Sequence, residues 1–150
     1  MTSDATWQPL AEALDRWRTA GRQPVFWLRD DDATEPTAAL DRLIYLSAHG
    51  EAPVALAVIP AFAGRPLANR LASAPHMVPV VHGWSHENHA PTGSKKQELG
   101  LHRPSEVVLG ELERALRRVE TLFAGQAVPL LVPPWNRIDA ALLPHLAGLG

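Results

Sequence analysis

Short apolar runs alternate with amphipathic segments along most of the chain. The apolar runs are residues 25–28 (VFWL), 54–59 (VALAVI), 78–81 (VPVV) and 128–132 (VPLLV). Each run is continuous, which predicts a strand whose faces are covered by helices. Helical spacing of apolar residues is found in 6–18, 37–49, 66–73, 105–125 and 138–148. This alternation predicts an α/β fold in which parallel strands are joined by helices.

Chemically distinctive residues follow the predicted strands. They lie at 29–32, at Pro60, at 82–89 and at 133–137. Because the carboxyl ends of parallel strands meet at one edge, and α/β folds bind ligands there, these four segments are expected to form one site.

Length, charge and composition narrow the classes of protein. The 150 residues suit one domain, with residues 1–23 as a leading helix. A formal net charge of −2 predicts neither nucleic-acid nor membrane-surface partners. With no cysteine, disulfides and thiolate metal sites are excluded, so any metal must be bound by His, Asp or Glu. No secretory signal and no apolar run of about 20 residues is visible, so we expect a cytoplasmic location.

Three adjacent carboxylates occur in RDDDA, residues 29–33. An Asp-rich turn would explain them, and so would a site in which one Asp binds a cation and a neighbour acts as a base. Neighbouring side chains of an extended segment point in different directions, so the three cannot reach one site equally well.

Two histidines occur at i and i+4 in HGWSH, residues 82–86. This spacing lets the rings of His82 and His86 face a common point. Neutral imidazole is a frequent ligand of zinc-like cations, and two His with one Asp leave open positions for an activated water. The same ligands form the facial triad of non-haem iron oxygenases, so the ligand set leaves both chemistries open.

These motifs, together with the Pro-Pro-aromatic segment in VPPWN (132–136), resemble the polysaccharide deacetylase superfamily, which has NodB homology and includes carbohydrate esterase family 4. The resemblance covers roughly residues 24–148. It implies part of a distorted (β/α) barrel and the hydrolysis of N- or O-acetyl groups with a divalent metal.

The resemblance also implies roles for individual residues. Asp31 is the expected general base, while Asp32, His82 and His86 are the expected ligands. In the alternative register Asp30 is the base. Zn²⁺ is the expected metal, with Co²⁺, Mn²⁺, Ni²⁺ or Fe²⁺ as alternatives.

Other positions correspond less directly to the family. Pro134 and Trp135 match the loop that shapes the substrate site. Val132 stands where that loop normally has the arginine that holds the base, and Arg29 or Arg137 is expected to replace it. All four of Arg29, Pro134, Trp135 and Arg137 are therefore expected on the substrate side.

The region after the histidine pair carries further candidates. Asn88 and His89 are expected to support the ligands, and His89 or His102 is a candidate for the general acid. Residues 90–104 are expected to form a lid over the site or a solvated loop. The family's Leu-x-His motif, which supplies the acid, has no match, so the chain is expected to lack the C-terminal third of the domain or to be a minimal variant.

The resulting functional hypothesis is a metal-dependent deacetylase, a hydrolase of non-peptide C–N bonds. Its expected substrate is an acetylated carbohydrate or a related small amide. A non-catalytic relative that keeps the metal is the alternative, followed by a non-haem Fe(II) oxygenase. The sequence sets no oligomeric state.

Overall fold

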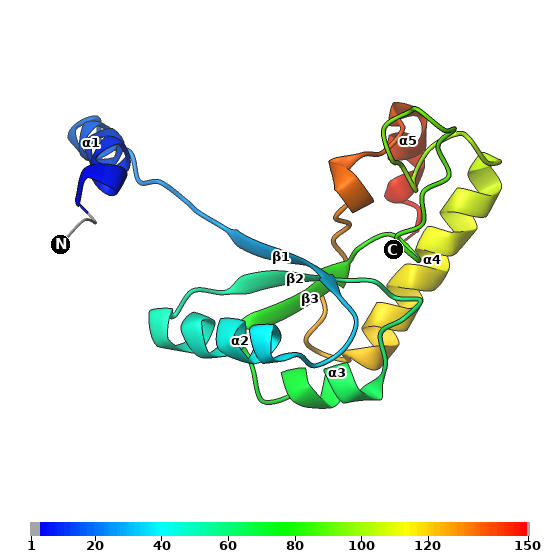
Figure 1. The fold of residues 1–150 in the computed structure, drawn as a ribbon, viewed down its shortest axis with the longest axis horizontal. Coiled ribbons are helices and arrows are strands. Elements are labelled where there is room, and N and C mark those ends of the chain that lie inside the picture. The colour runs from blue at the N-terminus through cyan, green and yellow to red at the C-terminus, as the bar shows by residue number, and fades with distance from the viewer. Residues whose placement is uncertain (1–3, 150) are drawn as a thin grey trace.

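The computed structural model describes residues 4–149, in which a parallel sheet packs against helices (Figure 1). The strands are β1 (Leu28–Ala33), β2 (Val54–Val58) and β3 (Met77–Val81), in the order β1-β2-β3. The α-helices are α1 (Asp4–Thr19), α2 (Ala38–Gly50), α3 (Arg65–Leu71), α4 (Ser105–Leu122) and α5 (Leu143–Leu146). Two 3₁₀ helices, η1 (Pro134–Asn136) and η2 (Ala140–Leu142), follow α4. The α/β class predicted from the alternating pattern is confirmed.

The main core lies between one face of the sheet and helices α2, α3 and α4. Leu40 of α2, Leu67 of α3 and Val119 of α4 pack with buried residues of β2 and β3. The opposite face carries a smaller cluster of Ala57, Val80 and Val132. The last two strands are thus buried on both faces, as their continuous apolar sequence requires.

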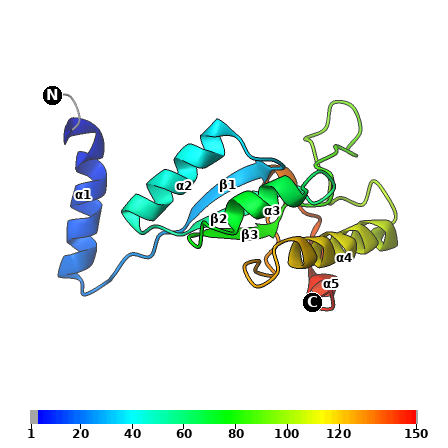
Figure 2. The same ribbon diagram turned by 90° about the horizontal axis from the view of Figure 1, so that it is seen from below.

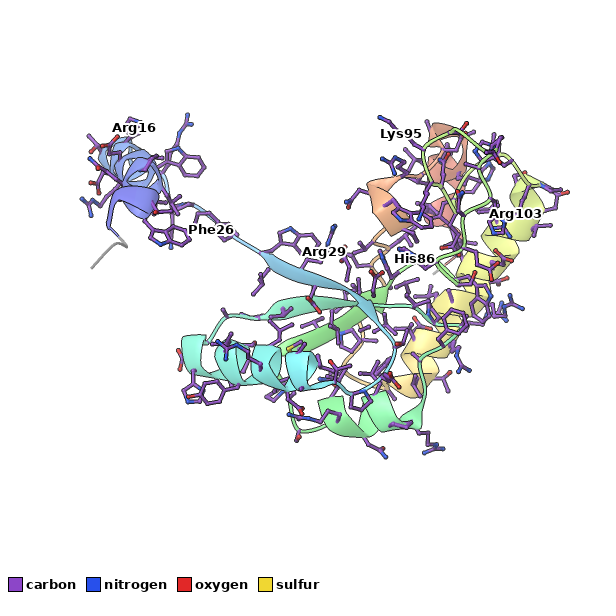
Figure 3. The ribbon with its side chains drawn as sticks, in the orientation of Figure 1. Arg16, Phe26, Arg29, His86, Lys95 and Arg103 are labelled. Atoms are coloured by element: carbon purple, nitrogen blue, oxygen red, sulfur yellow. The ribbon has the colours of Figure 1, made fainter. Side chains whose placement is uncertain are left out.

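Strand β1 lies further along the chain than predicted. The predicted strand at 25–28 overlaps β1 only at Leu28, and Val25, Phe26 and Trp27 are 93%, 71% and 61% exposed. Leu28 pairs with Val54, the first residue of β2, so the residues before Leu28 have no strand to pair with. Phe26 instead lies in the extended segment between α1 and the sheet (Figure 3). Residues 29–32 therefore lie within β1, and only the end of the run reaches the carboxyl edge.

The C-terminal part is less regular than predicted. Residues 128–132 contribute one parallel bridge, between Leu131 and Val81, instead of a fourth strand. Between the hydrogen bonds that the Val128 and Val132 N–H groups donate to β3, the Leu130 N–H donates to the Val128 carbonyl at 2.7 Å, which interrupts the ladder. The helix predicted for 138–148 is divided between η2 and α5, and α4 ends at Leu122, before the predicted residue 125.

Helix α1 stands apart from the sheet, at the end of the extended segment (Figure 2). It confirms the helix predicted for 6–18, while residues 1–3 of the predicted leading segment lie outside the described residues. No helix within the described range is long and apolar enough to cross a membrane.

Candidate metal centre

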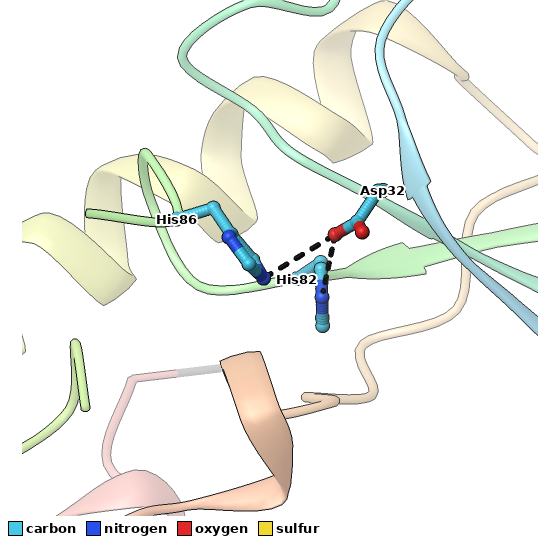
Figure 4. A group of neighbouring side chains, drawn as sticks. All are labelled: Asp32, His82 and His86. Carbon is cyan, nitrogen blue, oxygen red and sulfur yellow. Dashed lines mark ion pairs between the residues drawn. The ribbon is translucent and has the colours of Figure 1, made fainter. Parts of the chain in front are cut away.

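Asp32, His82 and His86 converge at the carboxyl edge of the sheet (Figure 4). Asp32 Oδ1 lies 3.2 Å from His82 Nε2 and 3.3 Å from His86 Nε2. Asp32 belongs to the end of β1, while both histidines follow β3. The structure thus brings together the three side chains that the sequence proposes as ligands.

The tautomer of His82 directs its lone pair toward Asp32. His82 is 2% exposed, and its Nδ1 lies 2.8 Å from the carbonyl oxygen of Val132. Because a carbonyl oxygen only accepts, Nδ1 carries the proton, and Nε2 of the neutral ring is left with a lone pair. A metal-binding histidine is oriented in this way by a hydrogen bond from its second nitrogen.

The two separations from Asp32 Oδ1 fit a divalent cation. With Nδ1 bonded to the Val132 carbonyl, His82 Nε2 faces a carboxylate oxygen of Asp32, so a cation between them would be bound by both atoms. Tetrahedral zinc has bonds of about 2.0–2.1 Å, which place neighbouring ligand atoms about 3.3 Å apart. The 3.2 Å and 3.3 Å separations agree with that value. The donor set and its spacing both suit such an ion.

The histidines are brought together by a bend, although their i,i+4 spacing suggested a helical turn. Residues 82–86 contain no helix, and Gly83 and His86 have φ values of 63° and 58°. The two left-handed residues reverse the chain and place the imidazole centroids 5.1 Å apart. The chain therefore reaches the geometry expected from the motif by a different backbone path.

Glu98 holds this bend from inside the protein. Its side chain is fully buried, and Oε1 accepts hydrogen bonds from the backbone N–H groups of Trp84 (2.9 Å) and Ser85 (2.8 Å). Oε2 accepts one from the N–H of His86 at 3.1 Å. Residues 98–100 are buried, so the solvated loop expected at 90–104 is wrong there, while 91–96 are exposed. No motif marked Glu98, because its partners lie 12 to 14 residues away.

Asp31 is held by Arg29 on the same strand. The two residues are at i and i+2 and so lie on one face of β1. Arg29 Nη2 donates to Asp31 Oδ2 at 3.0 Å, and Nε lies 2.9 Å from Oδ1 without the alignment of a hydrogen bond. Of the two expected replacements for the family's arginine, Arg29 contacts Asp31, whereas Arg137 Nη1 donates to the carbonyl of Lys96 at 3.2 Å.

Asp30 differs from its two neighbours. The strand alternation places it on the face opposite Asp31. Burial raises the pKa of Asp30, and the nearby charges of Asp31 and Asp32 raise it further. Residues 30–32 all contribute to the lining of a cavity of about 430 Å³ beside α2.

The segment 132–137 contacts both the histidine side and the aspartate side of the centre. The Trp135 ring lies 4.2 Å from the His86 ring, and Pro134 is buried against Gly83, where an added Cβ would lie 2.6 Å from Pro134 Cγ. Asn136 Oδ1 accepts a hydrogen bond from Arg29 Nη2 at 2.9 Å. The sequence did not single out Asn136, although it adjoins the Pro-Pro-aromatic motif.

Asn88 and His89 participate in the structure of their own loop. Asn88 Oδ1 accepts from the N–H groups of Ala90 (3.1 Å) and Gln97 (2.9 Å). The His89 N–H donates to the Gln97 carbonyl at 3.0 Å. His89 and His102 both lie outside the group formed by Asp32 and the two ligand candidates.

Comparisons with known proteins place the fold. No family model matches the sequence, and no curated protein sequence matches it. A solved structure that matches is a family 4 carbohydrate esterase from Streptomyces lividans in complex with acetate, with a TM-score of 0.56 and 17% sequence identity. The alignment covers 83% of this chain, which spans 58% of the length of the esterase chain. The chain therefore shares an α/β fold with a carbohydrate esterase.

Proposed function

We propose that the protein is a metal-dependent hydrolase that removes acetyl groups from an N-acetylated sugar or a related small amide. The convergence of Asp32, His82 and His86, with His82 oriented by the Val132 carbonyl, is the observation that carries the proposal. The fold shared with a carbohydrate esterase that was solved with acetate supports the same reaction class.

Zn²⁺ is the proposed metal, and Co²⁺, Mn²⁺, Ni²⁺ and Fe²⁺ suit the same ligands. When bound, the ion would polarise the acetyl carbonyl and lower the pKa of a water molecule.

Asp31 is the proposed general base, which takes a proton from the attacking water. Arg29 fixes the orientation of its carboxylate by contacts with both oxygens. Trp135, packed against the His86 ring, forms a wall of the site, with Lys96 Nζ 5.8 Å from its ring centroid. Pro134 and Arg137, in the same segment, are proposed to shape the substrate side.

Metal binding is the first test. Wild-type protein purified without chelators should contain close to one divalent ion per chain, measured by elemental analysis, and should bind Co²⁺ in equilibrium dialysis. The His82→Ala variant should lose this binding, while His145→Ala, which changes an exposed histidine of α5, should keep it. A wild-type protein that binds no divalent ion would contradict the proposal.

Acetate release is the second test. Incubation of the zinc-loaded protein with a panel of N-acetylated sugars and small N-acetyl amines should release acetate. Asp31→Asn should lower the rate by about 10²–10⁴-fold and retain the metal, because a general base contributes about that much. Variants of His89 and His102 would show which of them, if either, protonates the leaving amine. Full metal loading without acetate release from any substrate would instead favour a non-catalytic metal-binding protein.

A further inference from the structure

The carboxylate of Glu98 is buried in an unusual way. Its side chain is fully buried, and an isolated buried charge is strongly unfavourable unless it is paired or accepts hydrogen bonds. The ion pairs found among residues 4–149 give Glu98 no cationic partner. The neighbouring Arg103 pairs with Glu111 at 2.8 Å, and its Nη2 lies 3.5 Å from the backbone carbonyl of Glu98.

Backbone N–H groups take the place of the missing cation. Three consecutive residues, Trp84, Ser85 and His86, point their N–H groups at the two oxygens of Glu98, at 2.8 to 3.1 Å. Such a concave row of N–H groups is an anion-binding arrangement, and here the anion is a side chain of the same protein. Both oxygens accept, which is the pattern expected of an ionised carboxylate.

The segment held in this way is the one that connects the two candidate ligands. His82 is fixed by its own burial and by the Val132 carbonyl, whereas His86 is 22% exposed in its side chain and has a left-handed backbone with φ of 58°. A residue other than glycine adopts this conformation in only a few per cent of cases, and contacts with its surroundings then stabilise it. The hydrogen bond from the His86 N–H to Glu98 is made by the backbone of this left-handed residue itself.

Gly83 shows how closely the carboxylate approaches the bend. A Cβ atom at this position would lie 2.2 Å from Glu98 Oε2, and the φ of Gly83 is 63°. Only glycine leaves room for the carboxylate at this distance and also adopts that φ without strain. The bend and Glu98 therefore fit together as one unit.

We propose that Glu98 is a positioning residue for the metal centre: by binding the N–H groups of residues 84–86, it sets the place of His86 relative to His82. This inference rests on the proposed metal site. Removal of the carboxylate should let His86 relax from the left-handed conformation, so that its Nε2 no longer lies 3.3 Å from Asp32 Oδ1. The free energy of metal binding should then fall by more than the free energy of unfolding of the metal-free protein.

The experiment compares Glu98→Gln and Glu98→Ala with Glu111→Gln. Glu111 is a suitable control because it belongs to the same part of the protein, forms its own ion pair with Arg103, and contacts no candidate ligand. Co²⁺ affinity is measured by dialysis, the absorption spectrum of the Co²⁺ form reports its coordination, and melting in the presence of EDTA reports the stability of the metal-free fold. In the metal-free protein, NMR follows the amide protons of residues 84–86.

Glu98→Gln keeps the shape of the side chain and one acceptor oxygen, but its amide group cannot accept from His86. We expect about 10-fold weaker Co²⁺ binding for Glu98→Gln and about 100-fold for Glu98→Ala, the range found when groups that orient metal ligands are removed. The Co²⁺ spectrum should change and the His86 amide proton should shift upfield. Glu111→Gln should lower the melting temperature but leave Co²⁺ affinity within about 3-fold of wild type.

Two results would overturn the inference. The first is a folded Glu98→Gln variant with the Co²⁺ affinity and the Co²⁺ spectrum of the wild type. The second is a Glu111→Gln variant that loses as much Co²⁺ affinity as Glu98→Gln when the two have the same melting temperature. Either result leaves the proposed function standing, because the wild-type protein still binds the metal. Absence of Co²⁺ binding by the wild-type protein would overturn both proposals. If Glu98→Ala does not fold, Glu98→Gln decides the question alone.

Discussion

The two arms of the candidate metal centre are built very differently. The histidine arm, His82 and His86, follows β3, a strand buried on both faces, and its His82 is 2% exposed and hydrogen-bonded to the Val132 carbonyl. The aspartate arm lies at the end of β1, an outer strand, where the side chain of Asp32 is 61% exposed and its φ is 69°. The pairing of β1 with β2 is also irregular between Asp30 and Ala33.

Because the two arms differ in burial, they are expected to contribute differently to the metal centre. The histidine arm is fixed by the core before any ion binds, so it determines where a cation would lie. The aspartate arm is accessible and its backbone is irregular, so its position depends more on local contacts such as the Arg29 ion pair with Asp31. Substitutions in the histidine arm should therefore affect both folding and metal binding, whereas those in the aspartate arm should affect binding or catalysis alone.

The largest expected effect comes from His82→Ala, compared with Asp32→Ala. Zinc-finger peptides bind Zn²⁺ with a free energy of about 10–16 kcal/mol, which is shared among four ligands. Loss of one ligand should therefore cost about 3 kcal/mol of binding free energy, or more than 100-fold in affinity. Both variants should show this loss in Co²⁺ titrations. His82→Ala should also destabilise the metal-free fold by about 1–3 kcal/mol, because it leaves the Val132 carbonyl without its donor.

Urea unfolding in EDTA measures the second effect. Asp32→Ala should be as stable as wild type or slightly more stable, because it removes one of three adjacent carboxylates. Equal destabilisation by the two variants would show that the arms do not differ in the way described.

Gly83→Ala is expected to rank next. Its Cβ would meet Glu98 Oε2 and Pro134 Cγ at 2.2 Å and 2.6 Å, in a residue with φ of 63°. The left-handed conformation costs about 1–2 kcal/mol and overpacking costs about 1–3 kcal/mol. Gly83→Ala should therefore lower the free energy of unfolding by about 2–5 kcal/mol.

Gly93→Ala is the matched control. Gly93 also has a positive φ, of 88°, but a Cβ there would meet nothing within 4 Å. In the same urea titration, the free energy of unfolding of Gly93→Ala should fall only by the cost of the left-handed conformation, about 1–2 kcal/mol. Similar losses at both positions would mean that the space around Gly83 is not restricted by Glu98.

Arg29→Gln addresses the aspartate arm. Without the two contacts of its guanidinium, Asp31 can rotate, and a misplacement of about 1 Å in a reacting group can cost up to about 100-fold in rate. We expect kcat for acetate release to fall by about 10–100-fold, with Co²⁺ affinity within about 3-fold of wild type. Arg70→Gln, which breaks the ion pair with Asp41 between α3 and α2, should leave kcat unchanged. Loss of metal affinity in Arg29→Gln would instead place this arginine among the supports of Asp32.

The same contrast explains how far the sequence alone could lead. The candidate ligands belong to short motifs, His-x-x-x-His and Asp-Asp, whose spacing is visible without the fold. The position of β1 was not visible, because a strand extends only where its partner extends, and β2 begins at Val54. Glu98 was not visible either, since its role depends on backbone groups that the loop brings to it. Fold class followed from periodicity, whereas contacts between distant segments needed the structure.

Asp30→Asn should have the smallest effect, and it tests whether Asp30 belongs to the reacting group. Partial burial, followed by the charges of Asp31 and Asp32, raises the pKa of Asp30, so the folded state disfavours its ionised form. Stability from this group is present at low pH and decreases as the pH rises through the raised pKa. At neutral pH the uncharged Asn should therefore stabilise the metal-free protein. Because the residue is exposed and screened by water, the gain should be below about 0.5 kcal/mol.

For a chain of this length such a gain corresponds to a melting temperature about 1–2 °C higher in EDTA. Acetate release by Asp30→Asn should stay within about 3-fold of wild type, because the side chain lies on the strand face opposite Asp31. A loss as large as that expected for Asp31→Asn would assign the base to Asp30. Asp31 would then serve only as the partner of Arg29, and Asp32 would remain the candidate ligand.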